Sequence, residues 1–382
     1  MGMRLPMLIV VFLAGDMAMG DTVGLGDAKA AKKDEFYTQR VDIENELRHY
    51  KAHFKGKIVL CNCDDPRQSE FFKYFAENFE HLGLKRLIAT CYKSQDRDLF
   101  SHGDCERAIC QIYEGDKNGN MVVDDDEIGV RELKGDGDFR SEECIEILKQ
   151  ADVVVTNPPF SLFREYVAQL FKYGKDFLII GNVNAITYKE FFPMIRDNKV
   201  WMGASIHSGD RKFRVPDSYP LNAAGCGIDE NGRKFIRVKG VRWWTNLDYP
   251  QRHEKLPLYK KYSDAEFPKY DNYDAINVNN TSDIPYDYDG VMGVPITFLD
   301  KYNPEQFEII GISKTWFGGA CKIYPEQIEV GKNGNRKKVG KLNDGAVLAL
   351  NSEPVGKTYY LVDCKPYQQL YARIFIRRRK AQ

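Results

Sequence analysis

The feature that most constrains the fold is a regular alternation of apolar runs and amphipathic segments between residues 57 and 200. The apolar runs predict buried strands, and the segments between them place apolar side chains at helical spacing. We expect strands at 57–62, 84–92, 151–157 and 176–182, and helices at 69–83, 141–150, 161–174 and 186–198. Strands that alternate with helices form βαβ units, so we predict an α/β domain with a doubly wound, mostly parallel, Rossmann-like sheet.

The alternation ends near residue 205. Beyond it, short strand-like runs, tyrosine- and asparagine-rich turns and basic residues follow one another, which predicts a mixed α+β region over 206–382. The first domain would then span 32–205 and contain an acidic, glycine-rich insertion at about 93–135. Residues 1–31 would form a loose N-terminal extension.

The distribution of charge is more informative than its total, because the chain has 55 basic and 55 acidic residues. Residues 96–146 carry 16 acids and 6 bases, whereas residues 301–382 carry 15 bases and 7 acids. The chain closes with the basic run Arg377-Arg378-Arg379-Lys380. Clustered cations favour a phosphate-bearing partner. The alternative is a solvated surface with a ragged end, and charge alone does not choose between them.

Two patterns raise the question of a metal site. Residues 116–127 place acids and amides at the spacing of a calcium-binding loop, but Met121 stands where such a loop needs glycine, and no helix pattern clearly flanks it. We therefore predict a hairpin turned at Asn118-Gly119. The nine cysteines include no CxxC pair, so they indicate no zinc site. We expect no metal.

The N-terminus contains an apolar run, residues 5–15, that is too short to span a bilayer. It resembles the core of a secretory signal. A start codon placed too far upstream or a loose extension are the alternatives, and both agree better with the rest of the chain. We expect a cytoplasmic protein that does not enter a membrane.

The motif with the clearest chemistry is Asn157-Pro158-Pro159-Phe160, which follows an apolar strand directly. In an open parallel sheet, ligands bind at the carboxyl ends of strands. Asn157 and the carbonyl of Pro158 offer two acceptors, the prolines fix the backbone that carries them, and Phe160 offers an apolar face. Together they predict a receptor for a planar group that bears an amine. The alternative is a turn that only ends a strand, with Ser161 capping the next helix.

Such an amine on adenine or cytosine is a poor nucleophile, because its lone pair is delocalised into the ring. Acceptors that bind both of its hydrogens favour a lone pair on nitrogen and stabilise the developing positive charge. A sulfonium methyl donor would complete the reaction by in-line displacement. Cytosine is the less favoured base, since Asn and not Ser leads the motif.

The tetrad resembles the catalytic motif of S-adenosylmethionine (AdoMet)-dependent amino-methyltransferases, and the chain as a whole is similar to the EcoRI-type adenine-specific DNA methyltransferases. The runs that carry the resemblance span roughly residues 32–310 and include KKDEFYTQ, CNCDDPR, LKGDGDFRS, VVTNPPFSLFREYV, FLIIGNVNAITYKE and YDNYDAINV. The segments before residue 34, from 93 to 130 and after about 311 match less well.

The resemblance implies catalytic roles for Asn157, Pro158, Pro159 and Phe160. It also implies cofactor contacts at three further places and at Asn157: Phe36, Tyr37 and Thr38; Asp64, Asp65 and Pro66; Asp138 and Phe139. Gln39 replaces the proline expected after Thr38, and the loop after Pro66 lacks the family's glycines, so no glycine cradle is predicted there.

The implied activity is transfer of a methyl group from AdoMet to the N6 amine of a flipped-out adenine in double-stranded DNA. DNA recognition would lie in the C-terminal region. A cognate restriction endonuclease would act on the same site, and we expect a monomer. The alternatives are methylation of RNA or of protein glutamine, and a catalytically silent DNA-binding relative.

Overall fold

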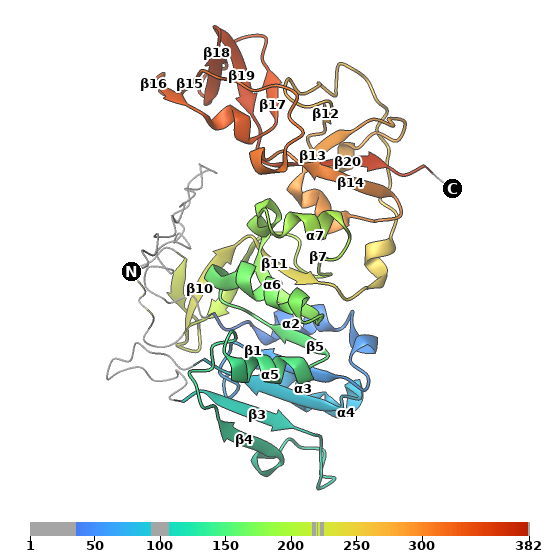
Figure 1. Ribbon diagram of the computed structural model, residues 1–382, viewed down its shortest axis with the longest axis vertical. Helices are drawn as coiled ribbons and strands as arrows, with labels where there is room; N and C mark the ends of the chain where they lie inside the picture. Colours follow the sequence, from blue (N-terminus) through green and yellow to red (C-terminus); the bar gives the residue numbers. More distant parts are fainter. Residues whose placement is uncertain (1–35, 93–106, 216–218, 220, 222–224, 381–382) are drawn as a thin grey trace, which may run out of the picture.

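The computed structural model describes residues 36–92, 107–215, 219, 221 and 225–380 (Figure 1). The predictions for residues 1–31, including the signal-like run, lie outside these ranges, as does the first part of the acidic insertion. The described residues form one large sheet covered by helices and three smaller sheets.

The large sheet has eight strands in the order β4-β3-β2-β1-β5-β6-β11-β7. In chain order they are β1 (Ile58–Asn62), β2 (Arg86–Thr90), β3 (Ile109–Tyr113), β4 (Ile128–Glu132), β5 (Val153–Thr156), β6 (Asp176–Asn182), β7 (Trp201–Met202) and β11 (Val241–Thr245). The four central strands β2, β1, β5 and β6 are parallel neighbours, and the outer strands join through antiparallel pairs. The predicted α/β class is thus confirmed. The sheet is mixed and not mostly parallel as predicted, because three of its strand pairs are parallel and four are antiparallel.

Helices cover both faces of this sheet because successive strand residues point to opposite sides. On one face Val153 and Val155 of β5 share a core with α2 (Arg40–Leu47), α3 (Glu70–Glu77) and α4 (Phe79–Leu82). On the other face Val154 shares a core with α5 (Glu142–Gln150), α6 (Phe163–Lys172) and α7 (Phe192–Arg196). The predicted helix at 69–83 is divided into α3 and α4, and the one at 186–198 is reduced to α7.

The large sheet extends beyond residue 205, where we predicted a domain boundary. β11 lies between β6 and β7, and its residues Trp243 and Trp244 are fully buried on opposite faces of the sheet. No local pattern indicates this placement, because β11 is separated from β6 by 58 intervening residues. The division into domains stays a prediction, but the main sheet requires strands from both sides of it.

The predicted hairpin at Asn118-Gly119 is confirmed, since β3 and β4 are antiparallel neighbours and the loop between them turns through Gly119 at a φ of 77°. The Asp116 carboxylate accepts hydrogen bonds from the backbone N–H groups of Gly119 and Met121, both at 2.6 Å. This carboxylate therefore shapes the turn of the loop that resembles a calcium site. The described residues contain no group of three or more His, Cys, Asp or Glu side chains arranged to hold a metal ion.

A small sheet in the order β8-β10-β9 follows β7 in the chain. It consists of β8 (Asp210–Arg214), β9 (Cys226–Ile228) and β10 (Lys234–Lys239). Tyr37 pairs with Arg214 of β8 through two backbone hydrogen bonds of 2.9 and 3.0 Å. The segment expected to hold the cofactor is therefore attached to a sheet formed some 175 residues later in the chain.

The C-terminal region contains two further sheets. The four-stranded sheet, in the order β12-β13-β20-β14, comprises β12 (Ile276–Asn277), β13 (Met292–Pro295), β14 (Phe307–Ile312) and β20 (Arg373–Arg378). The five-stranded sheet, in the order β16-β15-β18-β19-β17, comprises β15 (Gln327–Val330), β16 (Arg336–Val339), β17 (Val347–Ala349), β18 (Tyr359–Val362) and β19 (Lys365–Gln369). The five-stranded sheet projects as a separate lobe at the top of Figure 1.

Among the described residues, no helix has both the length and the apolar character that crossing a membrane requires.

Candidate active site

The carboxyl ends of β1 and β5 are tied together by side chains. The hydroxyl of Thr156 donates to the backbone carbonyl of Asn62, and the hydroxyl of Tyr166 donates to the Asn62 side-chain oxygen. All three residues are buried. The loop after β1 and the loop after β5 therefore start side by side at one edge of the sheet.

The tetrad begins directly after β5, as predicted. Asn157 is 6% exposed, and its Nδ2 donates a hydrogen bond of 2.5 Å to the backbone carbonyl of Phe36. This bond fixes which end of the amide is the acceptor. The Asn157 Oδ1 is buried and has no hydrogen-bond partner in the part of the chain that the structure describes. A buried acceptor without a partner is costly in a folded protein, so this oxygen is available to accept a hydrogen bond from a ligand donor.

Phe160 is half-buried at the end of the tetrad. Its ring makes edge contacts with the rings of Phe36 and Phe213, at centroid distances of 6.0 and 6.5 Å. Phe36 and Phe213 also contact each other at 5.9 Å and are both buried. Edge contacts of this kind are favourable, so two buried rings hold Phe160 in place. Phe213, on β8, is a site residue that the sequence analysis did not identify.

The Phe36-Tyr37-Thr38 segment runs beside the tetrad. Thr38 is 2% exposed, and its hydroxyl has no hydrogen-bond partner among the described residues. This second buried polar group without a partner lies two residues from the carbonyl that holds Asn157. The predicted cofactor segment and the predicted catalytic motif are thus brought together.

The loop after β1 is organised by its own side chains. The buried Asp65 carboxylate accepts hydrogen bonds from the backbone N–H and the Nε of Arg67, at 3.0 and 3.1 Å, and forms an ion pair of 2.9 Å with its Nη2. Asp64 accepts from Ser69 at 3.2 Å, and Pro66 is buried. These contacts stiffen a loop that has no glycines. Contact of Asp64, Asp65 and Pro66 with a cofactor stays a prediction.

Asp138 and Phe139 stand before α5. The Asp138 carboxylate accepts from the Arg140 backbone N–H and Nε, at 2.8 and 2.9 Å, and hydrogen bonding from Arg140 lowers the pKa of Asp138. The buried Phe139 ring packs against Tyr166 at 5.0 Å. Because Tyr166 also binds Asn62, this pair lies at the same edge of the sheet as the other predicted site residues. Contact of Asp138 and Phe139 with a cofactor stays a prediction.

Glu46 is a second residue that the sequence analysis missed. It is fully buried on α2 and accepts hydrogen bonds from the backbone N–H groups of Ala204 and Ser205, at 2.7 and 2.8 Å, and from the Tyr50 hydroxyl at 2.8 Å. A Cβ on Gly203 would lie 2.2 Å from its carboxylate. Glu46 therefore fixes the turn from which the chain continues to β8 and Phe213. Its position between Ile43 and Leu47 on an apolar helix face was the available signal.

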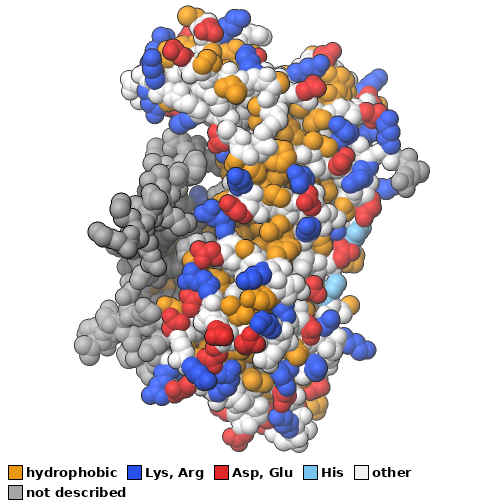
Figure 2. Space-filling model, viewed as in Figure 1, with side chains coloured by type: hydrophobic (Ala, Val, Ile, Leu, Met, Phe, Trp, Pro, Cys, Tyr) orange, Lys and Arg blue, Asp and Glu red, His pale blue; other side chains and the backbone are white. Residues whose placement is uncertain are grey.

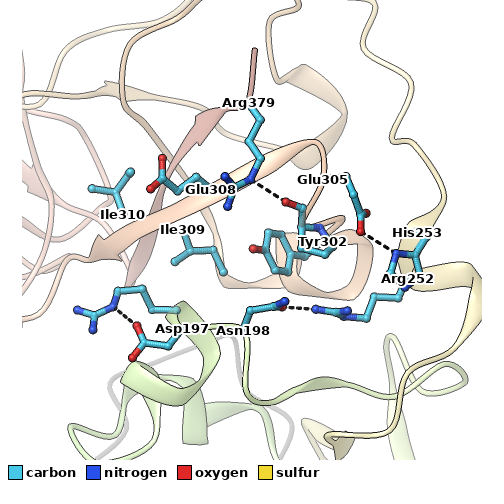
Figure 3. Close-up of a pocket in the computed structure, with 12 residues that line it drawn as sticks. Asp197, Asn198, Arg252, His253, Tyr302, Glu305, Glu308, Ile309, Ile310 and Arg379 are labelled. Atoms are coloured by element: carbon cyan, nitrogen blue, oxygen red, sulfur yellow. Dashed lines mark hydrogen bonds and ion pairs between the residues drawn. The ribbon is translucent and has the colours of Figure 1, made fainter. Parts of the chain in front are cut away.

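A cavity of about 720 Å³ lies elsewhere, between α7, the turn Pro250–His253 and the start of β14 (Figure 3). None of the predicted site residues lines it. The His253 ring contacts the carboxylates of Asp248 at 2.8 Å and Glu305 at 2.9 Å. Hydrogen bonding to Asp248, and to a smaller extent to Glu305, raises the pKa of His253. On the opposite wall the Nε of Arg379 donates to the Pro304 carbonyl at 2.7 Å. Arg252 Nη2 also donates a hydrogen bond to the Asn198 side-chain oxygen, and both residues line the cavity. This contact joins residues on the two sides of position 205, so we interpret the cavity as part of a structural junction.

Comparison with known proteins identifies the family. Residues 24–379 match the model of the family described as adenine-specific methyltransferase EcoRI. The chain belongs to this family. It is therefore an adenine-specific methyltransferase, as the motifs had indicated.

Individual members of the family agree with this assignment. The chain is 56% identical over 292 residues to the type II methyltransferase M.EcoRI of Escherichia coli, covering 76% of this chain and 89% of that protein. It is 39% identical over 287 residues to M.MgeORF184P of Mycoplasma genitalium, covering 74% and 84% of the two chains. It is 38% identical over 290 residues to M.MpnI of Mycoplasma pneumoniae, covering 74% and 83%. No solved structure matches this adenine methyltransferase.

Proposed function

We propose that this adenine methyltransferase transfers a methyl group from AdoMet to the N6 amine of an adenine that is flipped out of duplex DNA. The observation that carries the proposal is the Asn157 amide, whose Nδ2 is bound to the Phe36 carbonyl and whose Oδ1 is buried without a partner. This arrangement presents one acceptor, in a fixed orientation, to an incoming amine. The type II names of the relatives support a role in a restriction-modification system, in which an endonuclease acts on the same site.

The residues at this edge fit a bound AdoMet. The Thr38 hydroxyl is buried without a partner among the described residues, and the family resemblance implies contacts with the same cofactor at Asp64, Asp65, Pro66, Asp138 and Phe139. Bound AdoMet supplies a methyl group on a positively charged sulfur. The Thr38 hydroxyl can therefore bind a polar group of the cofactor beside Asn157. The cofactor contact that the family resemblance implies for Asn157 itself stays a prediction.

The tetrad binds the adenine base and stabilises the charge that develops on it. Asn157 Oδ1 accepts one hydrogen of the N6 amine, the Pro158 carbonyl accepts the other, and Phe160 stacks on the ring. With AdoMet bound, formation of the N6–CH3 bond and loss of the S–CH3 bond would place positive charge on N6, and the two acceptors would stabilise that charge. N6 then loses one proton to solvent, and the products are N6-methyladenine and S-adenosylhomocysteine.

The test uses the purified full-length chain with AdoMet labelled on its methyl group, offered duplex DNA, RNA and protein separately. The expected result is labelled N6-methyladenine in nucleosides released from the duplex. Detection of modified adenines along the same DNA would also give the recognition sequence. Labelling of RNA or of protein glutamine, with none in DNA, would contradict the proposal.

A further inference from the structure

The β15–β16 hairpin carries the most one-sided charge in the C-terminal region. From Gly331 to Lys341 the chain has five basic residues and no acid. All five basic side chains are exposed. β16 is the outermost strand of the five-stranded sheet, so one side of the hairpin faces solvent along its whole length.

Most of this charge has no partner within the protein. Lys337 and Lys341 form ion pairs with Glu329, at 3.0 and 2.9 Å. Lys332, Arg336 and Lys338 form no ion pair with any carboxylate that the structure describes. Two of the five cations thus share one carboxylate and three have none, so the hairpin keeps a net positive charge that attracts polyanions.

The hairpin is a fixed element. β15 pairs with β16 over four residues, from Gln327 opposite Val339 to Val330 opposite Arg336. The sheet has a small core on one face, which includes Tyr324 and Leu342, and a second on the other face, formed around Val330 and Leu361. Cations on such a ribbon lose little additional entropy when they bind, unlike cations on a loose tail.

The hairpin lies on the same side of the molecule as the active site. β8 and β10 border Phe36 and Phe160 through Phe213 and Arg214. In Figure 1, β16 and β10 both lie toward the left, whereas the C-terminus lies on the right. Lys and Arg side chains follow the left border of the upper lobe in Figure 2.

Lysines on an edge strand also have a simpler role, because they prevent sheets from associating edge to edge. That role requires charge on β16 alone. It does not account for Lys332 in the turn or Lys341 beyond the strand, which extend the basic surface past the paired residues.

We propose that the β15–β16 hairpin is a phosphate-binding arm that holds duplex DNA outside the methylated site, an inference that rests on the proposed function. The duplex presents one negative charge per about 1.7 Å of its axis, so a ribbon with several cations can contact phosphates on either side of a groove. The arm contributes affinity that does not depend on the sequence it touches.

The experiment compares two triple variants of the full-length chain. The first, Lys332→Gln/Arg336→Gln/Lys338→Gln, removes the unpaired cations of the hairpin. The control, Lys55→Gln/Lys85→Gln/Lys172→Gln, removes the same charge from exposed positions that precede β1, β2 and β6, at the opposite edge of the large sheet. Fluorescence anisotropy measures binding to a duplex of about 30 base pairs, roughly three helical turns, over a range of salt concentrations.

We expect the hairpin variant to reduce the slope of log K against log salt by about 2 to 3 units, because each phosphate contact contributes about 0.9. The control should change the slope by less than about one unit. Methyl transfer at saturating duplex should be the same in both variants as in the unmodified chain. On a duplex of about ten base pairs, one helical turn, the hairpin variant should bind like the unmodified chain, because the arm has no flanking phosphates to contact.

An unchanged slope in the hairpin variant, or an equal loss in the control, would overturn the proposal. A loss that persists on the short duplex would show that the hairpin contacts the methylated site itself, and would overturn its location outside that site. These outcomes are distinct from failure of the proposed function, in which the unmodified chain would not methylate DNA at all.

Discussion

At the carboxyl edge of the large sheet the functional groups are few, buried and fixed, whereas on the β15–β16 hairpin they are numerous and exposed. Asn157 has a single orientation, set by one hydrogen bond to Phe36. On the hairpin, Lys332, Arg336 and Lys338 offer the same charge from neighbouring positions. The proposed chemistry therefore depends on individual atoms, whereas the proposed affinity for the duplex is shared among several cations.

The two basic segments of the C-terminal region, the β15–β16 hairpin and the run at residues 377–380, also differ from each other. The run that ends the chain is partly engaged within the protein: Arg378 pairs with Asp289 at 3.6 Å, and Arg379 donates to Pro304. Arg377 and Arg378 are the last residues of β20, which lies between β13 and β14 in its sheet, and Arg379 and Lys380 follow that strand. Sequence alone predicted a phosphate-binding role for the whole basic end, and that role stays a prediction for this run.

The largest effect is expected at the catalytic edge. Asn157→Ala should reduce kcat about 100- to 1,000-fold, because the developing charge on N6 loses a preorganised acceptor. Binding of AdoMet and of duplex DNA should change little. The control is Asn280→Ala, which removes an exposed amide bound to Asp283. Near-normal turnover of Asn157→Ala would mean that the tetrad only ends a strand, and the comparison above would fail.

A substitution of Glu46, the buried carboxylate that holds the turn before β8, tests whether this turn also depends on a single side chain. Glu46→Ala leaves the partly buried N–H groups of Ala204 and Ser205 without their acceptor and should lower the free energy of unfolding by about 2–4 kcal/mol. The matched control is Glu44→Ala on the same helix, which removes an exposed ion pair with Arg40 and should cost under about 1 kcal/mol. Urea unfolding measures both. Equal destabilisation would show that the buried carboxylate has no special structural role.

His253, which lines the cavity beside α7, gives a smaller, pH-dependent effect. Its pKa is raised by hydrogen bonds to Asp248 and Glu305. A raised histidine pKa stabilises the folded state fully below the unfolded value of about 6.5, and this stabilisation is lost as pH rises through the folded value. The urea midpoint should therefore fall from pH 6 to pH 8 by more in the unmodified chain than in His253→Gln. Parallel pH profiles would contradict this expectation. The groups are partly exposed, so the difference should be small.

The smallest effect is expected from the C-terminal run. Arg377→Gln/Arg378→Gln/Arg379→Gln should change the salt slope of DNA binding by less than about one unit, because two of the three arginines have partners in the protein. Anisotropy titrations on the duplex used for the hairpin variant provide the measurement. If this variant lost as much slope as the hairpin variant, the contrast between the two basic segments would be wrong.

The sequence predicted those features that depend on local pattern. Apolar runs located β1, β2, β5 and β6, and strand order in βαβ units placed Asn157 at a carboxyl end. The approach of Phe36 to Asn157 was implied by the family resemblance, and the hydrogen bond between them gives its geometry. Gly119 indicated the turn of the hairpin, because glycine adopts a positive φ without steric cost.

Other features depend on contacts between distant segments, which a local pattern does not encode. Nothing near Phe213 indicates that its ring supports Phe160, because their contact joins residues more than 50 positions apart. Trp243 and Trp244 suggested a strand, but periodicity could not show that this strand joins the main sheet beside β6. The same holds for Arg379, whose partner is set by the arrangement of β14 and β20.

The position of β11 also constrains how the chain matures during its synthesis. Until residue 245 has left the ribosome, β6 remains an unpaired edge with its backbone N–H and C=O groups exposed, and Trp243 and Trp244 are missing from the two cores. A fragment that ends near residue 205 would thus be prone to pair with other chains. The large sheet can be completed only after the small sheet that carries Phe213 has also been made, so the tetrad and the ring that supports Phe160 become available together.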